Sequence, residues 1–209
     1  MLLWLQPNAI DFAKELGNPP AAGSPAQKAD LDAVVAATRA RTPAREAAAK
    51  EDGRQTLVRF LEGMEIDISK KQTSEARALF KQANAELETM VHVFKLQSER
   101  RRPYLAEKKL VKPCPGNMPR TSSFPSTHAA TGTLFAALLT EAAPELKAKN
   151  EARALSYGES RMVCGFHYLT DTQAGAKVGE LVAKALLADK AFKARFDETR
   201  KEIRSALGL

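Results

Sequence analysis

The chain contains no long apolar run. Its longest apolar stretch, residues 129–143, is interrupted by Thr, Gly and Glu, and it falls short of the roughly 20 apolar residues that a membrane span needs. The opening segment Met1–Leu5 is apolar but too short for a signal peptide, and no basic segment precedes it. We therefore expect no membrane span. Either the protein is cytoplasmic, with Met1 as its native start, or a leader has been removed.

Cysteine and histidine are scarce, with two cysteines and three histidines in 209 residues. No Cys-rich, His-rich or carboxylate-rich motif supplies the four ligands of a structural metal site, so we predict no metal and no other cofactor. Cys114 and Cys164 are compatible with one disulfide that closes a loop of about 50 residues. They are equally compatible with two separate thiols, because spacing alone does not fix the geometry.

Charge of one sign dominates only slightly. The 32 basic and 25 acidic residues give a net charge of +7 and a pI near 9.5. This balance favours anionic partners, but the two signs are intermixed, which is typical of solvated helix faces rather than of a nucleic-acid-binding surface. The apolar content of 44% is ordinary for a globular protein, and the length fits one domain.

Strand patterns and internal repeats are also lacking, whereas helix signals are frequent. Ser24 followed by Pro25 and Gln27 is typical of a capped helix start. Between Leu79 and Phe94, apolar residues recur with a 3.6-residue period. We therefore predict an all-α helical bundle. The expected helices run from 25 to about 41, from 43 to 63, from 73 or 74 to about 102, over about fifteen residues from 126, from 144 to about 164, from 170 to 187, and from 189 onward.

The domain organisation follows from these helices. We predict a single domain over residues 1–209, in which residues 1–70 form a helical arm packed on a bundle of residues 73–209. The segment from Tyr104 to Pro125 contains four prolines and one glycine and has no periodicity. It is predicted to be a long loop, and loops of this length inside compact domains are usually functional.

Three short motifs carry the chemistry. The first is Lys95-x6-Arg102-Pro103. On one continuous helix, seven residues bring two side chains back to within about 20° of the same face, so Lys95 and Arg102 could converge on one tetrahedral anion. Two alternatives stay open. The segment could be a solvated basic helix end that complements the helix dipole, or Lys95 could pair with Glu99 one turn further on.

The second motif is Pro125-Ser126-Thr127-His128, at the start of an apolar helix. Ser126 suits the N-cap position, and the first free N–H groups of a helix form a ready anion site. His128, in the first turn, could donate a proton to an oxygen of the same anion. The alternative is an ordinary serine cap followed by a surface histidine.

The third motif is Ser160-Arg161-x5-His167-x3-Asp171. Four residues make about one helical turn, so Asp171 could accept a hydrogen bond from His167 and leave the other ring nitrogen free to attack. Gly165 offers a chain break that could turn Arg161 toward the same point. Alternatives are a helix-stabilising His–Asp pair or a metal site. The remaining histidine, His92, has no partner motif, and we interpret it as structural.

In this order, the three motifs resemble the signature of the type 2 phosphatidic acid phosphatase and vanadium haloperoxidase superfamily. The signature of that superfamily is Lys-x6-Arg-Pro, then Pro-Ser-Gly-His, then Ser-Arg-x5-His-x3-Asp. Within it, the phrase Ser160-Arg161-Met162-Val163-Cys164-Gly165-Phe166-His167 is similar to that of the class A bacterial non-specific acid phosphatases. The segments Pro19-Pro20-Ala21-Ala22-Gly23-Ser24, Ala29-Asp30 and Arg41-Thr42-Pro43 resemble theirs as well, so the similarity covers nearly the whole chain.

The resemblance implies a metal-independent acid phosphatase that hydrolyses phosphate monoesters through a phosphohistidine. His167 would be the nucleophile, Asp171 would orient it, and His128 would protonate the leaving alcohol. Small phosphate monoesters would be the partners, without nucleic acid, and a homo-oligomer is left open. Members of the family are mostly periplasmic and work best in acid, which implies a periplasmic location here. The phosphate would be held by Lys95, Arg102, Ser126, Thr127 and Arg161.

The chain departs from the family pattern at Thr127, where the family has Gly. A side chain there adds bulk beside the expected phosphate, so we predict a narrower range of substrates and that Thr127→Gly would widen it. Two other functions remain as alternatives. One is a vanadate-dependent haloperoxidase, since the same cage holds vanadate. The other is a basic helical module that binds anions or nucleic acid without catalysis.

Overall fold

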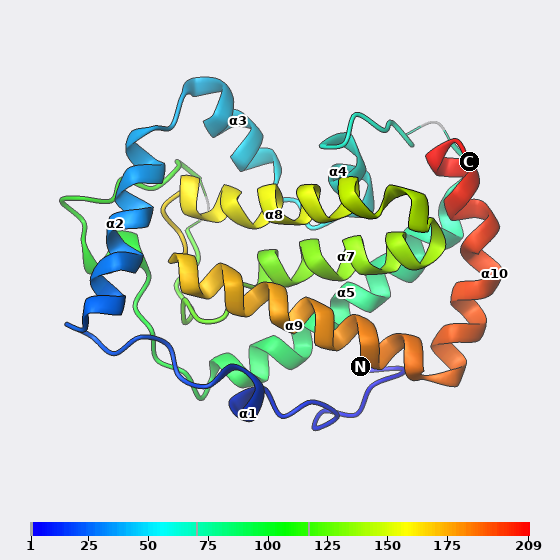
Figure 1. The fold of residues 1–209 in the computed structure, drawn as a ribbon, viewed down its shortest axis with the longest axis horizontal. Coiled ribbons are helices and arrows are strands. Elements are labelled where there is room, and N and C mark those ends of the chain that lie inside the picture. Colours follow the sequence, from blue (N-terminus) through cyan, green and yellow to red (C-terminus); the bar gives the residue numbers. More distant parts are fainter. Residues whose placement is uncertain (1, 70, 117) are drawn as a thin grey trace.

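The computed structural model describes residues 2–69, 71–116 and 118–209, and it confirms the predicted all-α class. Over these ranges it contains ten α-helices, one 3₁₀ turn and no strand (Figure 1). The helices are α1 (Phe12–Leu16), α2 (Pro25–Arg39), α3 (Pro43–Glu51), α4 (Leu57–Glu62), α5 (Ser74–Lys95), α6 (Pro103–Ala106), α7 (Thr127–Ala142), α8 (Lys147–Val163), α9 (Leu169–Ala188) and α10 (Lys190–Leu207), with the 3₁₀ turn at Pro144–Leu146.

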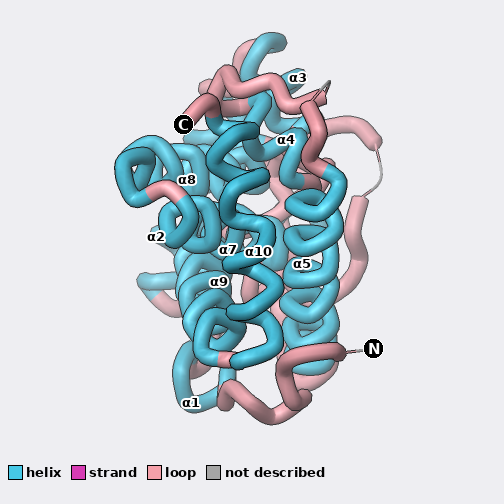
Figure 2. The backbone as a smooth tube through the Cα atoms, turned by 90° about the vertical axis from the view of Figure 1, so that its right-hand side faces the viewer, coloured by secondary structure: helices cyan, strands magenta, loops and turns pink. Residues whose placement is uncertain are grey.

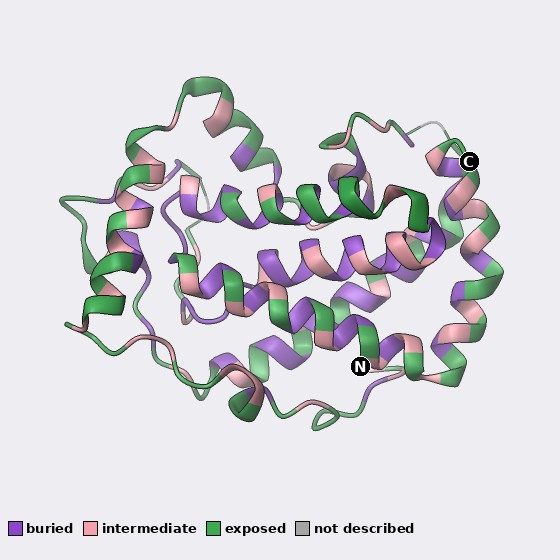
Figure 3. Ribbon diagram, in the orientation of Figure 1, coloured by how far each residue is buried: buried purple, intermediate pink, exposed green. Residues whose placement is uncertain are grey.

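Helix α7 is the centre of the bundle. It lies between α8 and α9, with α5 against it and α10 across one end (Figures 1 and 2). Most of its side chains are buried, as expected for an apolar helix without a polar face (Figure 3). Phe135 of α7 packs edge-on against Phe60 and Phe80, which joins the N-terminal helices to the bundle core.

Two glycines bring α9 unusually close to α7. A Cβ atom added to Gly175 would overlap the carbonyl oxygen of Ser126, and one added to Gly179 would overlap that of Ala130. Beside this contact, the Ser126 N–H donates a hydrogen bond to the carbonyl oxygen of Asp171 (2.9 Å). The second and third sequence motifs are therefore held directly against each other.

Side-chain caps begin several helices where the sequence predicts them. Ser24, Ser126 and Asp189 each accept a hydrogen bond from the N–H three residues on. The expected single helix over residues 43–63 is wrong, because α3 ends at Glu51 and α4 begins at Leu57. Thr56 caps the new helix by accepting from the Arg59 N–H, which restarts the chain in a different direction.

The prediction of one helix from residue 73 or 74 to about Arg102 is also wrong. Helix α5 ends at Lys95, residues 98–102 are not helical, and Pro103 is the first residue of α6. Arg102 has the extended backbone that proline imposes on the residue before it (φ −67°, ψ 150°). Pro103 therefore starts a helix instead of ending one. Helices α1 and α6 are short and were not predicted.

The N-terminal segments lie along the bundle. Leu5, Phe12 and Leu57 belong to the same apolar core as the C-terminal helices, and the buried carboxylate of Glu86 accepts hydrogen bonds from the N–H groups of Leu3 and Leu5. The single domain over 1–209, with residues 1–70 as an arm on the 73–209 bundle, stays a prediction. No helix in the described ranges combines the length and apolarity required to cross a membrane.

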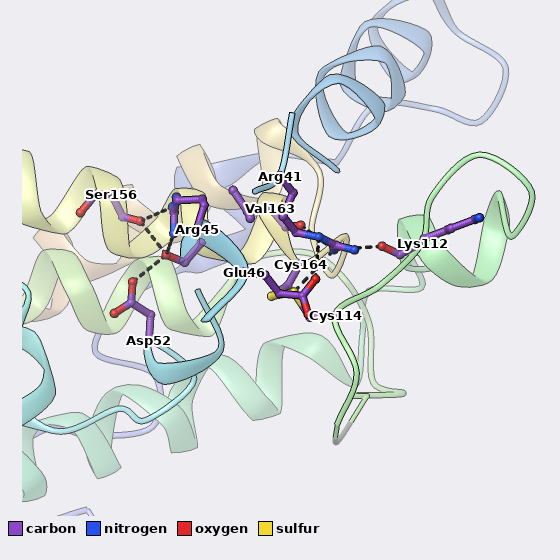
Figure 4. The surroundings of a disulfide bond; sticks show 10 residues. Arg41, Arg45, Glu46, Asp52, Lys112, Cys114, Ser156, Val163 and Cys164 are labelled. Carbon is purple, nitrogen blue, oxygen red and sulfur yellow. Dashed lines mark hydrogen bonds and ion pairs between the residues drawn. A yellow bond between two sulfur atoms is a disulfide. The ribbon is translucent and has the colours of Figure 1, made fainter. Parts of the chain in front are cut away.

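Cys114 and Cys164 form a disulfide, which decides a question that the sequence left open (Figure 4). The bond ties the loop between α6 and α7 to the turn between α8 and α9. Arg41 strengthens this junction, since its Nη1 donates to the carbonyl oxygens of Lys112 and Val163 (3.1 Å each). The loop that precedes the second motif is thus fixed to the turn that carries the third.

Candidate active site

A cavity of about 500 Å³ opens where the three motifs meet. Its walls come from the C-terminal end of α5, the first turn of α7, the turn between α8 and α9, and the loop before α7. Ser126 and Asp171, two of the eight predicted site residues, are fully buried and do not line it. The other six line it together: Lys95, Arg102, Thr127, His128, Arg161 and His167.

Lys95 and Arg102 converge on this cavity, but not by sharing a helix face as the sequence reasoning had it. The loop before α7 positions both of them through its backbone carbonyls. The Lys95 Nζ donates to the Ser122 carbonyl oxygen (3.0 Å), and the Arg102 Nε donates to that of Thr121 (2.9 Å). The Arg102 Nη1 also donates to the Phe166 carbonyl oxygen (3.0 Å). Carbonyl dipoles hold the cations in place while leaving their charge unneutralised.

Arg161 reaches the cavity from the last turn of α8. The positive φ of Gly165 (69°) reverses the chain after that helix, so that Arg161 and His167 face the same space, as predicted. The Arg161 guanidinium stacks over the Phe166 ring at 4.7 Å. Within the described residues, no carboxylate forms an ion pair with Arg161, Arg102 or Lys95, so the three buried cations share an excess of positive charge.

This excess shows in the pKa values. Burial, followed by repulsion from Arg102, lowers the pKa of Lys95 to about 7. The same two causes lower the pKa of Arg161 to about 10, and burial lowers that of Arg102 to about 10. Arginine stays charged at every physiological pH, so the cavity carries at least two positive charges and favours an anion.

The first turn of α7 forms one wall. The Ser126 hydroxyl caps the helix by accepting from the Ala129 N–H (3.3 Å), so it is already used within the protein. Thr127 is half-buried and its side chain lines the cavity where the family pattern has Gly. The His128 Nε2 donates to the Gly53 carbonyl oxygen (3.1 Å), which leaves Nδ1 as the acceptor nitrogen of the neutral ring.

His167 lies across the cavity from the first turn of α7 and two residues before α9 begins. The prediction that His167 and Asp171 share one helical turn is therefore wrong. Their side chains still face each other, with 3.4 Å between His167 Nδ1 and Asp171 Oδ2. The Arg102 Nη1 lies 3.0 Å from His167 Nε2. Because guanidinium only donates, Nε2 must be the acceptor and Nδ1 must carry the hydrogen. That tautomer points an unprotonated nitrogen at the three cations.

Both histidines resist protonation. Burial and then the charge of Arg102 lower the pKa of His167 well below its ordinary value, with Lys95 and Arg161 adding to the effect. Burial and then the charge of Arg161 do the same to the pKa of His128. An anion among the cations would oppose these shifts and raise both pKa values.

Arg100 is a residue that sequence reasoning missed. It is one of the unspecified positions between Lys95 and Arg102 in the first motif, yet it is buried between two carboxylates. Its Nη1 donates to Asp171 Oδ1 and its Nη2 to Asp30 Oδ2, both at 2.6 Å. Ser123 and the Tyr168 N–H hold the other oxygen of Asp171. Asp171 is therefore fixed by charge and hydrogen bonds before it meets His167.

The interpretation of His92 as structural stays a prediction, since no partner or role for its side chain is shown among the described residues. It is exposed on α5 and lines the cavity, as do Gln55 and Glu88, which no motif singled out. No three His, Cys, Asp or Glu side chains of the described residues lie close enough together to hold a metal ion. The roles assigned to the eight motif residues stay predictions.

Two known acid phosphatases are similar to this chain in sequence. The non-specific acid phosphatase of Salmonella typhimurium is 37% identical over 84 residues, which are 40% of this chain and 34% of that protein. The acid phosphatase of Zymomonas mobilis is 29% identical over 200 residues, or 91% of this chain and 75% of that protein. The match to the first of these relatives thus spans only about a third of that protein's length.

The fold has a solved counterpart. The crystal structure of the first transmembrane PAP2 type phosphatidylglycerolphosphate phosphatase from Bacillus subtilis superposes with a TM-score of 0.57, covering 90% of this chain and 91% of that one at 21% identity. At that identity, the likeness shows the fold alone. Residues 83–195, just over half of the chain, match the family described as the PAP2 superfamily. They include all eight predicted site residues, and the chain belongs to the PAP2 superfamily.

Proposed function

We propose that this protein is an acid phosphatase that hydrolyses small phosphate monoesters through a phosphohistidine, without a metal ion. The observation that carries the proposal is the set of three buried cations, unpaired with any carboxylate of the described residues, around the acceptor nitrogen of His167. A phosphoryl group in transfer spreads negative charge over three oxygens, and fixed positive charges stabilise it most. The acid phosphatases among the relatives support the same chemistry.

In the first step, His167 Nε2 attacks phosphorus and the bond from phosphorus to the ester oxygen breaks. Arg102 now donates to Nε2, so its guanidinium must transfer that hydrogen bond to a phosphate oxygen before attack. Protonated His128 gives its proton to the departing alkoxide, which leaves as the alcohol. The Nδ1–H of His167 faces Asp171, whose negative charge stabilises the imidazolium that forms.

In the second step, water attacks phosphorus, the bond from phosphorus to Nε2 breaks, and His128 takes a proton from the water. Inorganic phosphate leaves and both histidines return to their starting states. His128 must carry a proton for the first step, and burial, followed by the charge of Arg161, lowers its pKa. Acidic solution and the bound dianion both restore that proton, which is the physical reason to expect an acid optimum.

We further propose a periplasmic location. The Cys114–Cys164 disulfide supports it, because such bonds persist in the bacterial periplasm and are rare in the reducing cytosol.

The test uses p-nitrophenyl phosphate as a generic substrate, with and without a chelator. Wild-type protein should release phosphate at acid pH in both cases, and His167→Ala should lose activity and form no acid-labile phosphoenzyme. Two neighbouring arginines provide a matched pair. Arg102→Ala should lose at least about a hundredfold in kcat/KM. Arg101→Ala, at an exposed residue outside the cavity, should keep the wild-type rate. Full activity in His167→Ala would overturn the mechanism.

A further inference from the structure

The cavity continues past the cations along helix α5. Glu88, His92 and Lys95 all line it, and their spacing of four and then three residues places them on one face of the helix. Seven residues at 1.5 Å each separate Glu88 from Lys95 by about 10 Å along the axis. Glu88 therefore lines the part of the cavity away from the three cations, where the alcohol portion of an ester would lie.

Glu88 is held by neutral groups rather than by cations. Its Oε1 accepts hydrogen bonds from Gln55 Nε2 (2.8 Å) and Asn84 Nδ2 (3.0 Å). The Thr131 hydroxyl lies 2.8 Å from Gln55 Oε1 and 2.6 Å from Asn84 Oδ1, and its one hydrogen can be donated to either amide oxygen. Both amides turn their N–H groups toward Glu88 because an ionised carboxylate only accepts. Within the described residues, Glu88 Oε2 has no hydrogen-bond donor, so one acceptor atom is free.

The charge of Glu88 is not needed to balance its surroundings. Burial raises the pKa of Glu88, and the hydrogen bonds from Asn84 and Gln55 offset this only in part. Keeping this carboxylate ionised costs desolvation energy, two amides hold it in place, and one of its oxygens is free. Such a group is suited to accept a hydrogen bond from a ligand hydroxyl. It is unsuited to a ligand that brings a second negative charge to the same place.

We propose that Glu88, supported by Gln55, forms the leaving-group subsite of this enzyme and selects phosphate esters of polyhydroxylated alcohols. The proposal rests on the phosphatase function proposed above and names its substrate class. A hydroxyl of the alcohol donates to Glu88 Oε2, while the phosphate lies among Lys95, Arg102 and Arg161. Esters with an apolar aryl group gain nothing from Glu88, and esters with a second anionic group are disfavoured.

The experiment compares three substrates: glycerol 3-phosphate, 3-phosphoglycerate and p-nitrophenyl phosphate. Glu88→Leu removes the acceptor and should lower the ratio of kcat/KM for glycerol 3-phosphate over p-nitrophenyl phosphate about tenfold, mainly through KM. Glu88→Gln keeps an acceptor but removes the charge. It should keep most of that ratio and raise the use of 3-phosphoglycerate, which carries an extra carboxylate, relative to glycerol 3-phosphate.

Glu75→Gln is the matched control, since Glu75 lies in the first turn of the same helix and outside the cavity. It should leave all three substrates at their wild-type ratios. Equal losses on all substrates in both Glu88 variants would assign Glu88 a purely structural role and overturn the proposal, as would unchanged ratios. If Glu88→Leu does not fold, the test rests on Glu88→Gln, through its kcat/KM for 3-phosphoglycerate relative to glycerol 3-phosphate. Wild-type protein inactive on all three esters would overturn the phosphatase function itself, and this inference with it.

Discussion

Two groups of cations, each with one member on α8, differ in whether carboxylates pair with them. Arg153, on α8, donates to Asp52 Oδ1 at 2.7 Å, and Arg59 donates to the same oxygen at 2.8 Å. Arg161, two turns further along α8, has no carboxylate partner among the described residues, and neither do Lys95 and Arg102. The first group neutralises itself within the protein. The charge of the second group is not balanced by any carboxylate of the described residues.

The difference also appears in the pKa values at the two ends of the helix. Burial raises the pKa of Asp52, but hydrogen bonds from Arg153 and Ser160 and the charges of Arg153 and Arg59 outweigh it and lower the pKa overall. That carboxylate is therefore stabilised by its neighbours. The lowered pKa values of Lys95 and Arg161 report the reverse, a cost of burying like charges together. Such a cost persists where an anionic ligand offsets it.

The largest expected effect is on stability, at the paired group. Arg153→Met leaves Asp52 short of a buried partner and should lower the free energy of unfolding by about 3–5 kcal/mol. Denaturation in urea with an unchanged m-value would measure this. Arg54→Met is the control, because Arg54 pairs with Glu51 at the surface, and it should cost less than about 1 kcal/mol. If Arg153→Met were as stable as Arg54→Met, the Arg153–Asp52 pair would contribute no more than a surface pair, and the prediction would be wrong.

The next effect is on activity, at the unpaired group. Arg161→Met keeps an apolar side chain over Phe166 but removes one of the three cations proposed to bind phosphate, so kcat/KM should fall about 10²–10³-fold, or roughly 3–4 kcal/mol. Stability without ligand should be unchanged or higher, since a buried charge without a partner is gone. Added phosphate should raise the melting temperature of wild type and not of this variant. A loss of stability as large as that of Arg153→Met would show that Arg161 is structural.

The smallest effect concerns pH. With a pKa of about 7, Lys95 is charged below that pH and neutral above it, so anion affinity should decline as the pH rises through 7. Sulfate is a suitable probe, because its own charge is constant in this range. Its inhibition constant should be about fivefold weaker at pH 8 than at pH 7, and about tenfold weaker for each further unit. Lys95→Met should bind sulfate weakly at every pH. A wild-type curve that is flat from pH 7 to 9 would mean that Lys95 keeps its proton.

The local features of this molecule could be read from its sequence because they depend on neighbours along the chain. The caps at Ser24, Ser126 and Asp189 and the apolar face of α5 are of this kind. Lys95 and Arg102 do line one cavity, but not by the helical geometry that the sequence predicted. Their convergence comes from backbone carbonyls that lie 27 and 19 residues further along the chain, and no helical spacing contains that information.

Long-range partners were the part that could not be predicted. Arg100 is an unspecified position of the first motif, and only the folded chain shows Asp30 and Asp171 on either side of it. Glu88 belongs to no motif, and its role depends on Gln55, which lies 33 residues earlier. Residues of this kind are defined by what surrounds them in space, so a single sequence does not mark them.

The seam between α7 and α9 sets the width of the cavity from outside it. Gly175 and Gly179 touch no substrate, yet the missing methyl groups let Ser126–His128 lie against the segment that carries His167. A random mutagenesis screen for lost activity would therefore return these two glycines together with the histidines. The same seam offers an engineer a way to adjust the distance between His128 and His167, the proposed acid and nucleophile, by fractions of an ångström without altering either side chain.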